Sequence, residues 1–162
     1  MRCQLRPWIW PLPRLDGVAP CILESASELI PDDVELGYPV RSAAPGLVPV
    51  FAARDGVVIY AGTAANGSTI GIDHAGGWST EYAGLVHVLT RPTDRFRQRR
   101  KERVQAGDVI GHAPRSPLRI RFSVSRWSGD DDVAVDPGTC MRAWSMLPWF
   151  TDAPRVAAHP AV

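Results

Sequence analysis

Six short runs of β-branched and aromatic residues, separated by Gly-containing turns, occupy the middle of the chain between Leu47 and Val124. Runs of this length that are bounded by turn residues are typical of strands, and their close succession favours antiparallel pairing. The sequence therefore predicts a mainly β fold, with one compact antiparallel β-domain. The six runs are LVPVFA, GVVIYAG, STIGIDH, STEYAGL, DVIGHA and LRIRFSV.

The composition fits a single globular domain with a hydrophobic core. The chain has 162 residues, of which 45% are hydrophobic and 22% charged, and its formal net charge is +1. A balance this close to neutral gives no general case for a nucleic-acid or acidic partner. Cys3, Cys21 and Cys140 are odd in number and widely spaced, which favours reduced thiols over a disulfide framework or a cysteine metal site.

Both ends of the chain are irregular and rich in Trp and Pro. The N-terminal part contains WIWPLP at 8–13 and a helix-compatible stretch, CILESASEL, while the C-terminal part contains WSMLPWF at 144–150. We expect these aromatic clusters to cover the core, with docking to a partner as the alternative.

The run LRIRFSV alternates apolar and polar residues. Because successive side chains of a strand point to opposite faces, Ile120 and Phe122 should face the core, and Arg119 and Arg121 the opposite face. A one-residue slip would reverse this arrangement.

A basic stretch interrupts the β region at residues 91–103. Seven of its thirteen residues are Arg or Lys, and only Asp94 and Glu102 oppose them. Such stretches are usually solvated loops or short helices, and contact with an anionic partner is the alternative. Specific nucleic-acid recognition is not expected, because Phe96 is its only aromatic residue. The basic residues singled out here are Arg95, Arg97, Arg99, Arg100, Lys101 and Arg103.

The order of the β segments resembles the lysostaphin-like or LytM-type zinc metallopeptidases, which cut peptidoglycan cross-links. The resemblance covers residues 36–137 and implies the family's duplicated hybrid-motif β-domain with a groove. It leaves residues 1–35 as a wrapping segment and 138–162 as an aromatic tail. The segments that carry it are PVFAARDGVVIYAG, GSTIGIDHAGGWSTEYAGL, VQAGDVIGHA, LRIRFSV and VDP.

That family binds zinc with a His and an Asp four residues apart and with the second His of an H-x-H pair. The first His of the pair and the His of a Y-x-H-L segment assist catalysis. Carried onto this chain, the zinc positions are Gly37, Arg41 and Arg121, and the catalytic positions are Gly84 and Arg119. Arginine is a permanent cation with no lone pair for a metal. The resemblance therefore implies a degenerate member with no zinc, no cofactor and no catalytic residue at these positions.

Other metal or catalytic candidates are weaker. The four histidines, His74, His87, His112 and His159, show no ligand spacing on one face, so we expect them to be structural or surface residues. Ser79 lacks a neighbouring His base. The acidic run at 130–132 is expected to be a solvated loop.

The resemblance implies a pseudo-peptidase that acts as a binding or structural module in a cell-wall-directed assembly, such as a phage virion or tail, a secretion particle or a hydrolase regulator. The alternative is an active peptidoglycan endopeptidase with an unorthodox metal site, which the fold alone supports. Expected partners are proteins of a larger assembly, with peptidoglycan or a carboxylate group as a further ligand.

Four residues are candidates for binding: Arg41, Tyr82, Arg119 and Arg121. A guanidinium favours a carboxylate held by two parallel hydrogen bonds. That carboxylate is either internal, from acids such as Asp73 or Asp55, or external, from a peptide stem or a partner's side chain.

The start of the chain does not read as an export signal, because Pro7, Pro11 and Pro13 interrupt its apolar residues. No apolar run approaches the roughly 20 residues of a membrane span. We therefore expect synthesis in the cytoplasm, followed by action in a virion or secretion assembly, or at the cell envelope after delivery. A true start further upstream is the alternative.

Overall fold

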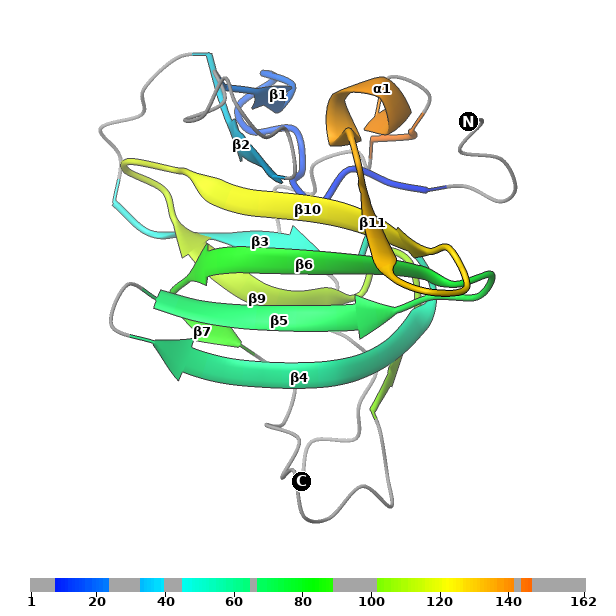
Figure 1. The fold of residues 1–162 in the computed structure, drawn as a ribbon. Helices are drawn as coiled ribbons and strands as arrows, with labels where there is room; N and C mark the ends of the chain where they lie inside the picture. Colours follow the sequence, from blue (N-terminus) through cyan, green and yellow to red (C-terminus); the bar gives the residue numbers. More distant parts are fainter. Residues whose placement is uncertain are drawn as a thin grey trace.

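The computed structural model describes residues 8–23, 33–39, 45–64, 67–88, 102–141 and 144–146. These ranges form two antiparallel sheets and one short helix, so the mainly β fold expected from the sequence is confirmed (Figure 1). The strands are β1 Cys21–Ile22, β2 Asp33–Gly37, β3 Leu47–Phe51, β4 Gly56–Ala64, β5 Gly67–Asp73, β6 Trp78–Leu85, β7 His87–Val88, β8 Arg103–Val104, β9 Val109–Pro114, β10 Ile120–Trp127 and β11 Asp132–Val135, and the helix is α1 Pro137–Met141.

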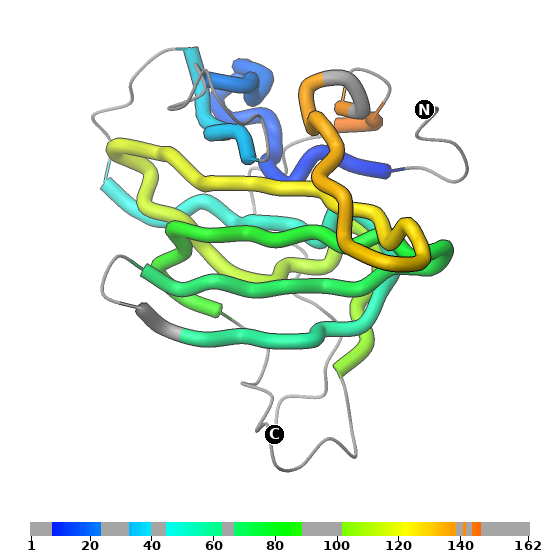
Figure 2. The backbone as a smooth tube through the Cα atoms, viewed as in Figure 1, coloured from blue at the N-terminus to red at the C-terminus, as the bar shows by residue number. Residues whose placement is uncertain are grey.

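The two sheets form two layers. The larger sheet has eight strands, with the path β1-β2-β10-β6-β5-β4-β8 and with β11 paired to the far end of β10, and the smaller sheet has the order β3-β9-β7. Figure 1 shows β3, β9 and β7 behind the central strands of the larger sheet, and Figure 2 traces the same two layers along the backbone. Side chains from both sheets meet between them and make one core.

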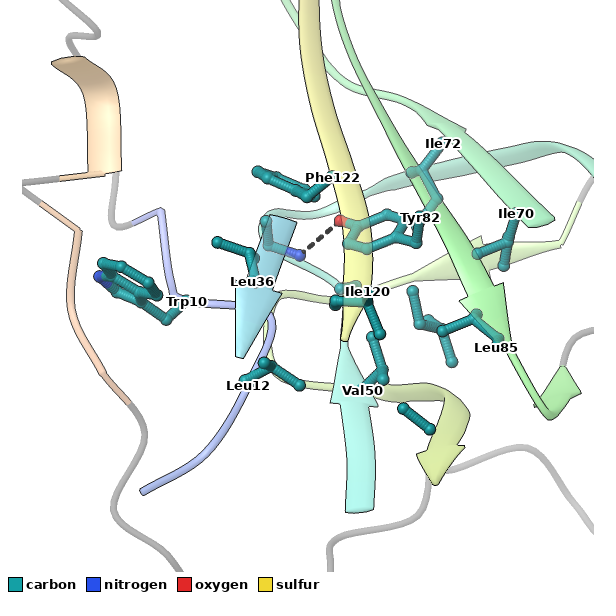
Figure 3. Close-up of a cluster of buried hydrophobic side chains, with 14 of the residues drawn as sticks. Trp10, Leu12, Leu36, Val50, Ile70, Ile72, Tyr82, Leu85, Ile120 and Phe122 are labelled. Carbon is teal, nitrogen blue, oxygen red and sulfur yellow. Dashed lines mark hydrogen bonds between the residues drawn. The ribbon is translucent and has the colours of Figure 1, made fainter. Parts of the chain in front are cut away.

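Tyr82 lies at the centre of this core, between the two sheets (Figure 3). Its ring is fully buried, and its hydroxyl accepts hydrogen bonds from the Ala53 amide at 2.9 Å and from the Thr80 hydroxyl at 3.0 Å. Burial raises the pKa of Tyr82 to about 12. The candidate binding residue Tyr82 is therefore a core residue whose polar atom is satisfied inside the protein.

Strand β10 has the facing that its alternation predicts. Ile120 and Phe122 are fully buried, whereas the side chain of Arg121 is 61% exposed on the outer face. The strand begins at Ile120 rather than at Leu118, although Leu118 is itself buried. A slip of one residue would place Arg121 in the core, which explains why this register is strongly specified.

The N-terminal segment packs on the core, as the cover hypothesis predicts. Trp8 and Trp10 are 3% and 7% exposed, and Trp8 stacks on Trp144 with 4.8 Å between ring centroids. The Trp10 indole donates a hydrogen bond to the Met141 carbonyl at 3.1 Å. Figure 3 shows Trp10 among the core side chains. Trp149 lies outside the described residues.

The helix-compatible stretch at 21–29 begins with a strand, and its residues 24–29 lie outside the described residues. Cys21 and Ile22 form β1, which pairs with Gly37 and Leu36 of β2. Tertiary pairing overrides local helix propensity here because β2 offers backbone partners at the sheet edge. Strand β2 also spans the expected division between residues 35 and 36, and that division of the chain stays a prediction.

Candidate functional site

The outer face of the larger sheet carries a charge ladder, which we define as Asp33 and Glu35 of β2 together with Arg119 and Arg121. Arg121 lies opposite Glu35 in the β2–β10 register. Its Nε and Nη2 atoms donate to Asp33 Oδ2 at 3.0 and 2.5 Å. Arg119 Nη1 lies 3.6 Å from Glu35 Oε2, which is longer than a good hydrogen bond.

These ion pairs are exposed to solvent. The side chains of Arg119 and Arg121 are 54% and 61% exposed, and those of Glu35 and Asp33 are 24% and 38% exposed. Exposed pairs contribute about 0–1 kcal/mol each, because water screens them and ordering the side chains costs entropy. The charge ladder is therefore a minor contributor to the stability of the fold.

The internal acids that partner the arginines are not those expected from the sequence. Asp73 belongs to β5, two strands away from β10, and through Ser79 of β6 it is level with Ser125 rather than with Arg121. Asp55 instead accepts a hydrogen bond from the Ala106 amide at 2.7 Å. Asp33 and Glu35 were missed because the pairing of β2 with β10 joins segments about 88 residues apart.

The structure brings four of the five family positions to one end of β2, β6 and β10. A Cβ atom on Gly37 would lie 2.6 Å from the Leu118 carbonyl oxygen. Gly84 has a φ of +82°, and a Cβ there would lie 3.4 Å from the carbonyl oxygen of Arg119. Arg41 lies outside the described residues.

The residues present do not fit zinc. Zinc in proteins takes unprotonated His, thiolate or carboxylate ligands. Gly37 has no side chain to act as a ligand, and there is no room for one. The guanidinium of Arg121 is positively charged and donates a hydrogen bond to Asp33. In the part of the chain that the structure describes, no three His, Cys, Asp or Glu side chains form a group with metal-ligand geometry.

A shallow hollow lies beside the charge ladder. Its volume is about 90 Å³, which is small for a ligand site, and its lining includes Asp33, Glu81, Ala83 and Arg121. Glu81 accepts a hydrogen bond from the hydroxyl of Tyr60, and burial together with that contact raises the pKa of Tyr60. The charged side chains that line this hollow, those of Asp33, Glu81 and Arg121, are thus already paired internally.

His74 is a satisfied core histidine, as expected. Its Nδ1 lies 2.8 Å from the Asp55 carbonyl oxygen, and its Nε2 lies 2.8 Å from the Thr80 hydroxyl. The ring of Trp8 packs against it edge-on at 5.2 Å. Burial lowers the pKa of His74 to about 4, so the imidazole is neutral at pH 7.

Two other histidines share a face, contrary to expectation. His87 of β7 is directly opposite His112 of β9, with ring centroids 6.5 Å apart. Burial, and to a lesser degree His87, lowers the pKa of His112. Spacing along the chain does not reveal this pair, because antiparallel pairing of distant strands creates it. His159 lies outside the described residues.

The basic stretch at 91–103 falls almost wholly outside the described residues. Of the residues singled out in it, Arg103 is described: it is exposed and pairs with Val57 as part of β8. Arg95, Arg97, Arg99, Arg100 and Lys101 lie outside the described ranges, so their contact with an anionic partner stays a prediction.

The two-layered antiparallel β-domain is that of a peptidase-like class of protein, and the positions that the resemblance assigns to Gly37, Gly84 and Arg121 lie at the ends of β2, β6 and β10. The chain belongs to peptidase family M23, whose family model matches residues 35–118, more than half of its length. The resemblance drawn from the sequence is therefore confirmed. No curated protein matches the chain.

Solved structures share the fold at low sequence identity. A putative glycyl-glycine endopeptidase LytM from Ruminococcus gnavus is 17% identical, with a TM-score of 0.58 over 89% of this chain and 64% of that chain. A complex of SpoIIIAH and SpoIIQ gives 18% identity and a TM-score of 0.56 over 80% of this chain and 96% of that chain. The M23 metalloprotease pseudoalterin is 14% identical, with a TM-score of 0.52 over 80% of this chain and 75% of that chain.

This chain spans less than two thirds of the R. gnavus protein and 63% of the matched chain in the SpoIIQ–SpoIIIAH pore-forming complex. These structural matches show a shared fold, and at identities this low they show the fold alone. Among the described residues, no helix has the length and apolar character needed to cross a bilayer.

Proposed function

We propose that this chain is a pseudo-peptidase: an M23-fold module that binds a protein partner in a cell-wall-directed assembly and does not hydrolyse peptidoglycan. The observation that carries the proposal is the engagement of Arg121 with Asp33 where the family has a zinc ligand. A phage virion or tail, a secretion particle and a regulated hydrolase complex are the assemblies to which such a module would belong.

Loss of hydrolysis follows from the chemistry of the site. In zinc hydrolases the metal lowers the pKa of its bound water to about 7, which supplies hydroxide at neutral pH. Arg119 and Arg121 repel a dication, and Gly37 cannot be replaced by a ligand without moving the Leu118 backbone. We therefore derive no hydrolytic step for this site.

A binding role is supported by the relatives and by the surface. SpoIIQ, which shares the fold, was solved in a complex with SpoIIIAH. In this chain the arginines of the charge ladder are more than half exposed, so their remaining donors face solvent, where a partner's carboxylate can meet them. Arg121 would contact the partner, while Asp33 and Glu35 hold the guanidinium groups in position.

The test combines metal analysis with a digestion assay. The protein is purified in the presence of zinc, dialysed, and analysed for metal, and it is then incubated with cross-linked peptidoglycan beside an active M23 peptidase. We expect far less than one zinc per chain and no release of muropeptides. Zinc at one per chain together with chelator-sensitive release would overturn the proposal.

The alternative, an active endopeptidase with an unorthodox site, has one observation in its favour: the His87–His112 pair. Two imidazoles are fewer than the three protein ligands of known catalytic zinc sites. The pair also lies on the smaller sheet, not on the outer face of the larger sheet where the family positions converge. A His87→Ala variant that lost peptidoglycan cleavage would favour this alternative.

A further inference from the structure

A pocket of about 600 Å³ lies between the N-terminal segment and the entry to β10. This volume falls within the range of roughly 300–1,000 Å³ that is typical of small-ligand sites. Its walls come from four parts of the chain: residues 15–18, Leu23 after β1, residues 38–39 after β2, and residues 115–119. Residues 15–18 lie outside the part that matches the M23 family model, which ends at residue 118, so one wall of the pocket comes from outside that match.

The walls are apolar and held in place by internal hydrogen bonds. The apolar residues are Leu15, Val18, Leu23, Tyr38, Pro39, Pro117 and Leu118. The Tyr38 hydroxyl donates to the Pro13 carbonyl at 2.5 Å, and the backbones of Leu15 and Val18 exchange two hydrogen bonds of 2.9 Å. A site that is ordered before binding loses less entropy when a ligand enters.

Two arginines line the pocket, and each has an acidic neighbour. Arg115 and Arg119 bring two positive charges, and Asp16 brings one negative charge, which is engaged with Arg115. Arg119 lies 3.6 Å from Glu35 and its side chain is 54% exposed. Its guanidinium can therefore offer hydrogen bonds to a carboxylate at the rim of an apolar pocket.

We propose that this pocket binds the C-terminal residue of a partner protein, with its apolar side chain against Leu15, Val18 and Leu118 and its terminal carboxylate on Arg119. A chain end places an apolar side chain and a carboxylate on one residue, which matches an apolar wall with a cation at its rim. This inference rests on the proposed function and deepens it, because it names the chemistry of the partner.

The experiment measures binding of N-acetylated tetrapeptides to the full chain by calorimetry. Three probes end in Leu, Val or Phe with a free carboxylate, and each has a C-terminal amide counterpart. We expect at least one free acid to bind and its amide to bind more weakly by about tenfold or more, since a hydrogen bond to a charged group is lost. Failure of all three free acids, or equal binding of the amides, overturns the proposal.

Variants of Arg119 and Val18 test which residues of the pocket contact the peptide. Arg119→Gln should weaken the free acid about tenfold and leave the amide unchanged. Val18→Asp should abolish binding of the acid by adding a negative charge to the half-buried wall, while a thermal melt shows that the protein stays folded. The matched control is Arg126→Gln, at the other end of β10, where the guanidinium lies over the Trp78 ring. Equal loss in Arg119→Gln and Arg126→Gln would contradict the assignment.

A last binding measurement distinguishes two ligands that carry the same carboxylate: the end of a protein chain and a free small acid. N-acetyl-leucine that binds as tightly as the tetrapeptide ending in Leu would overturn the chain-end assignment in favour of a small acid. Failure of all peptide binding would not alter the metal and muropeptide results, so the two proposals fail separately.

Discussion

At the scale of single residues, Gly37 occupies a position that has no room for a side chain. Its missing Cβ would lie 2.6 Å from the Leu118 carbonyl oxygen and 2.7 Å from the Leu23 side chain. The Leu23 side chain can move, but the carbonyl belongs to the backbone that leads into β10. Any larger residue at this position must therefore displace the main chain.

We expect Gly37→Ala to destabilise the protein by about 1–3 kcal/mol, the usual cost of overpacking. The matched control is Gly62→Ala in β4, because a Cβ at Gly62 meets nothing within 4 Å. That control should change the free energy of unfolding by less than about 0.5 kcal/mol. Urea unfolding measures both, and equal costs for the two variants would refute the steric account.

His74 gives the stability a pH dependence. Burial lowers its pKa from 6.5 to about 4 in the folded state, so the unfolded chain binds more protons between these values. Stability from this group is fully present above pH 6.5 and is lost as the pH falls toward 4, by up to roughly 3 kcal/mol. Unfolding measured from pH 7 to pH 4 should be less pH-dependent in His74→Gln than in the wild type, and identical slopes would contradict this assignment.

At the scale of elements, the pairing of β2 with β10 decides what the arginines do. Because the ion pairs of the charge ladder are exposed, Arg121→Glu should fold normally and cost less than about 1 kcal/mol. The proposed function requires this variant to lose partner binding. Unfolding of Arg121→Glu would show instead that the internal pair with Asp33 is the purpose of the arginine.

A charge swap separates these two roles of Arg121 further. Arg121→Glu combined with Asp33→Arg restores an opposite-charge pair across the two strands, so it should recover the stability lost in the single variant. Partner binding should stay lost, because the cation has moved to β2. Recovery of binding in the double variant would indicate that net charge, rather than the position of Arg121, determines recognition.

At the scale of the whole molecule, the N-terminal segment is part of the core. Trp8, Trp10 and Leu12 are buried against both the sheets and the C-terminal residues Met141 and Trp144. Burial of a large apolar side chain contributes about 1.5–3 kcal/mol. Deletion of residues 1–13 should therefore lower the melting temperature by many degrees or prevent folding. A truncation that retains Trp8 onward is the control, and an unchanged melting temperature after the longer deletion would show the segment to be dispensable.

Local patterns in the sequence were enough to predict the β fold, the facing of β10 and the family. Alternation with period two determines which side of a strand is buried, so the sequence alone placed Ile120 and Phe122 in the core. The assignment of two of the family's zinc positions to Gly37 and Arg121 rests on the order of the segments and stays a prediction.

Only the tertiary structure decided which distant groups meet. Asp33 as the partner of Arg121, the His87–His112 pair and the pocket lined by residues 15–18 all arise from pairing or packing between segments far apart in the chain. Strand order and register depend on how the whole core is filled, and many acids in one chain are equally suitable partners for an arginine. Residue patterns thus determined each strand's faces, and the packing of the two sheets determined the neighbours across them.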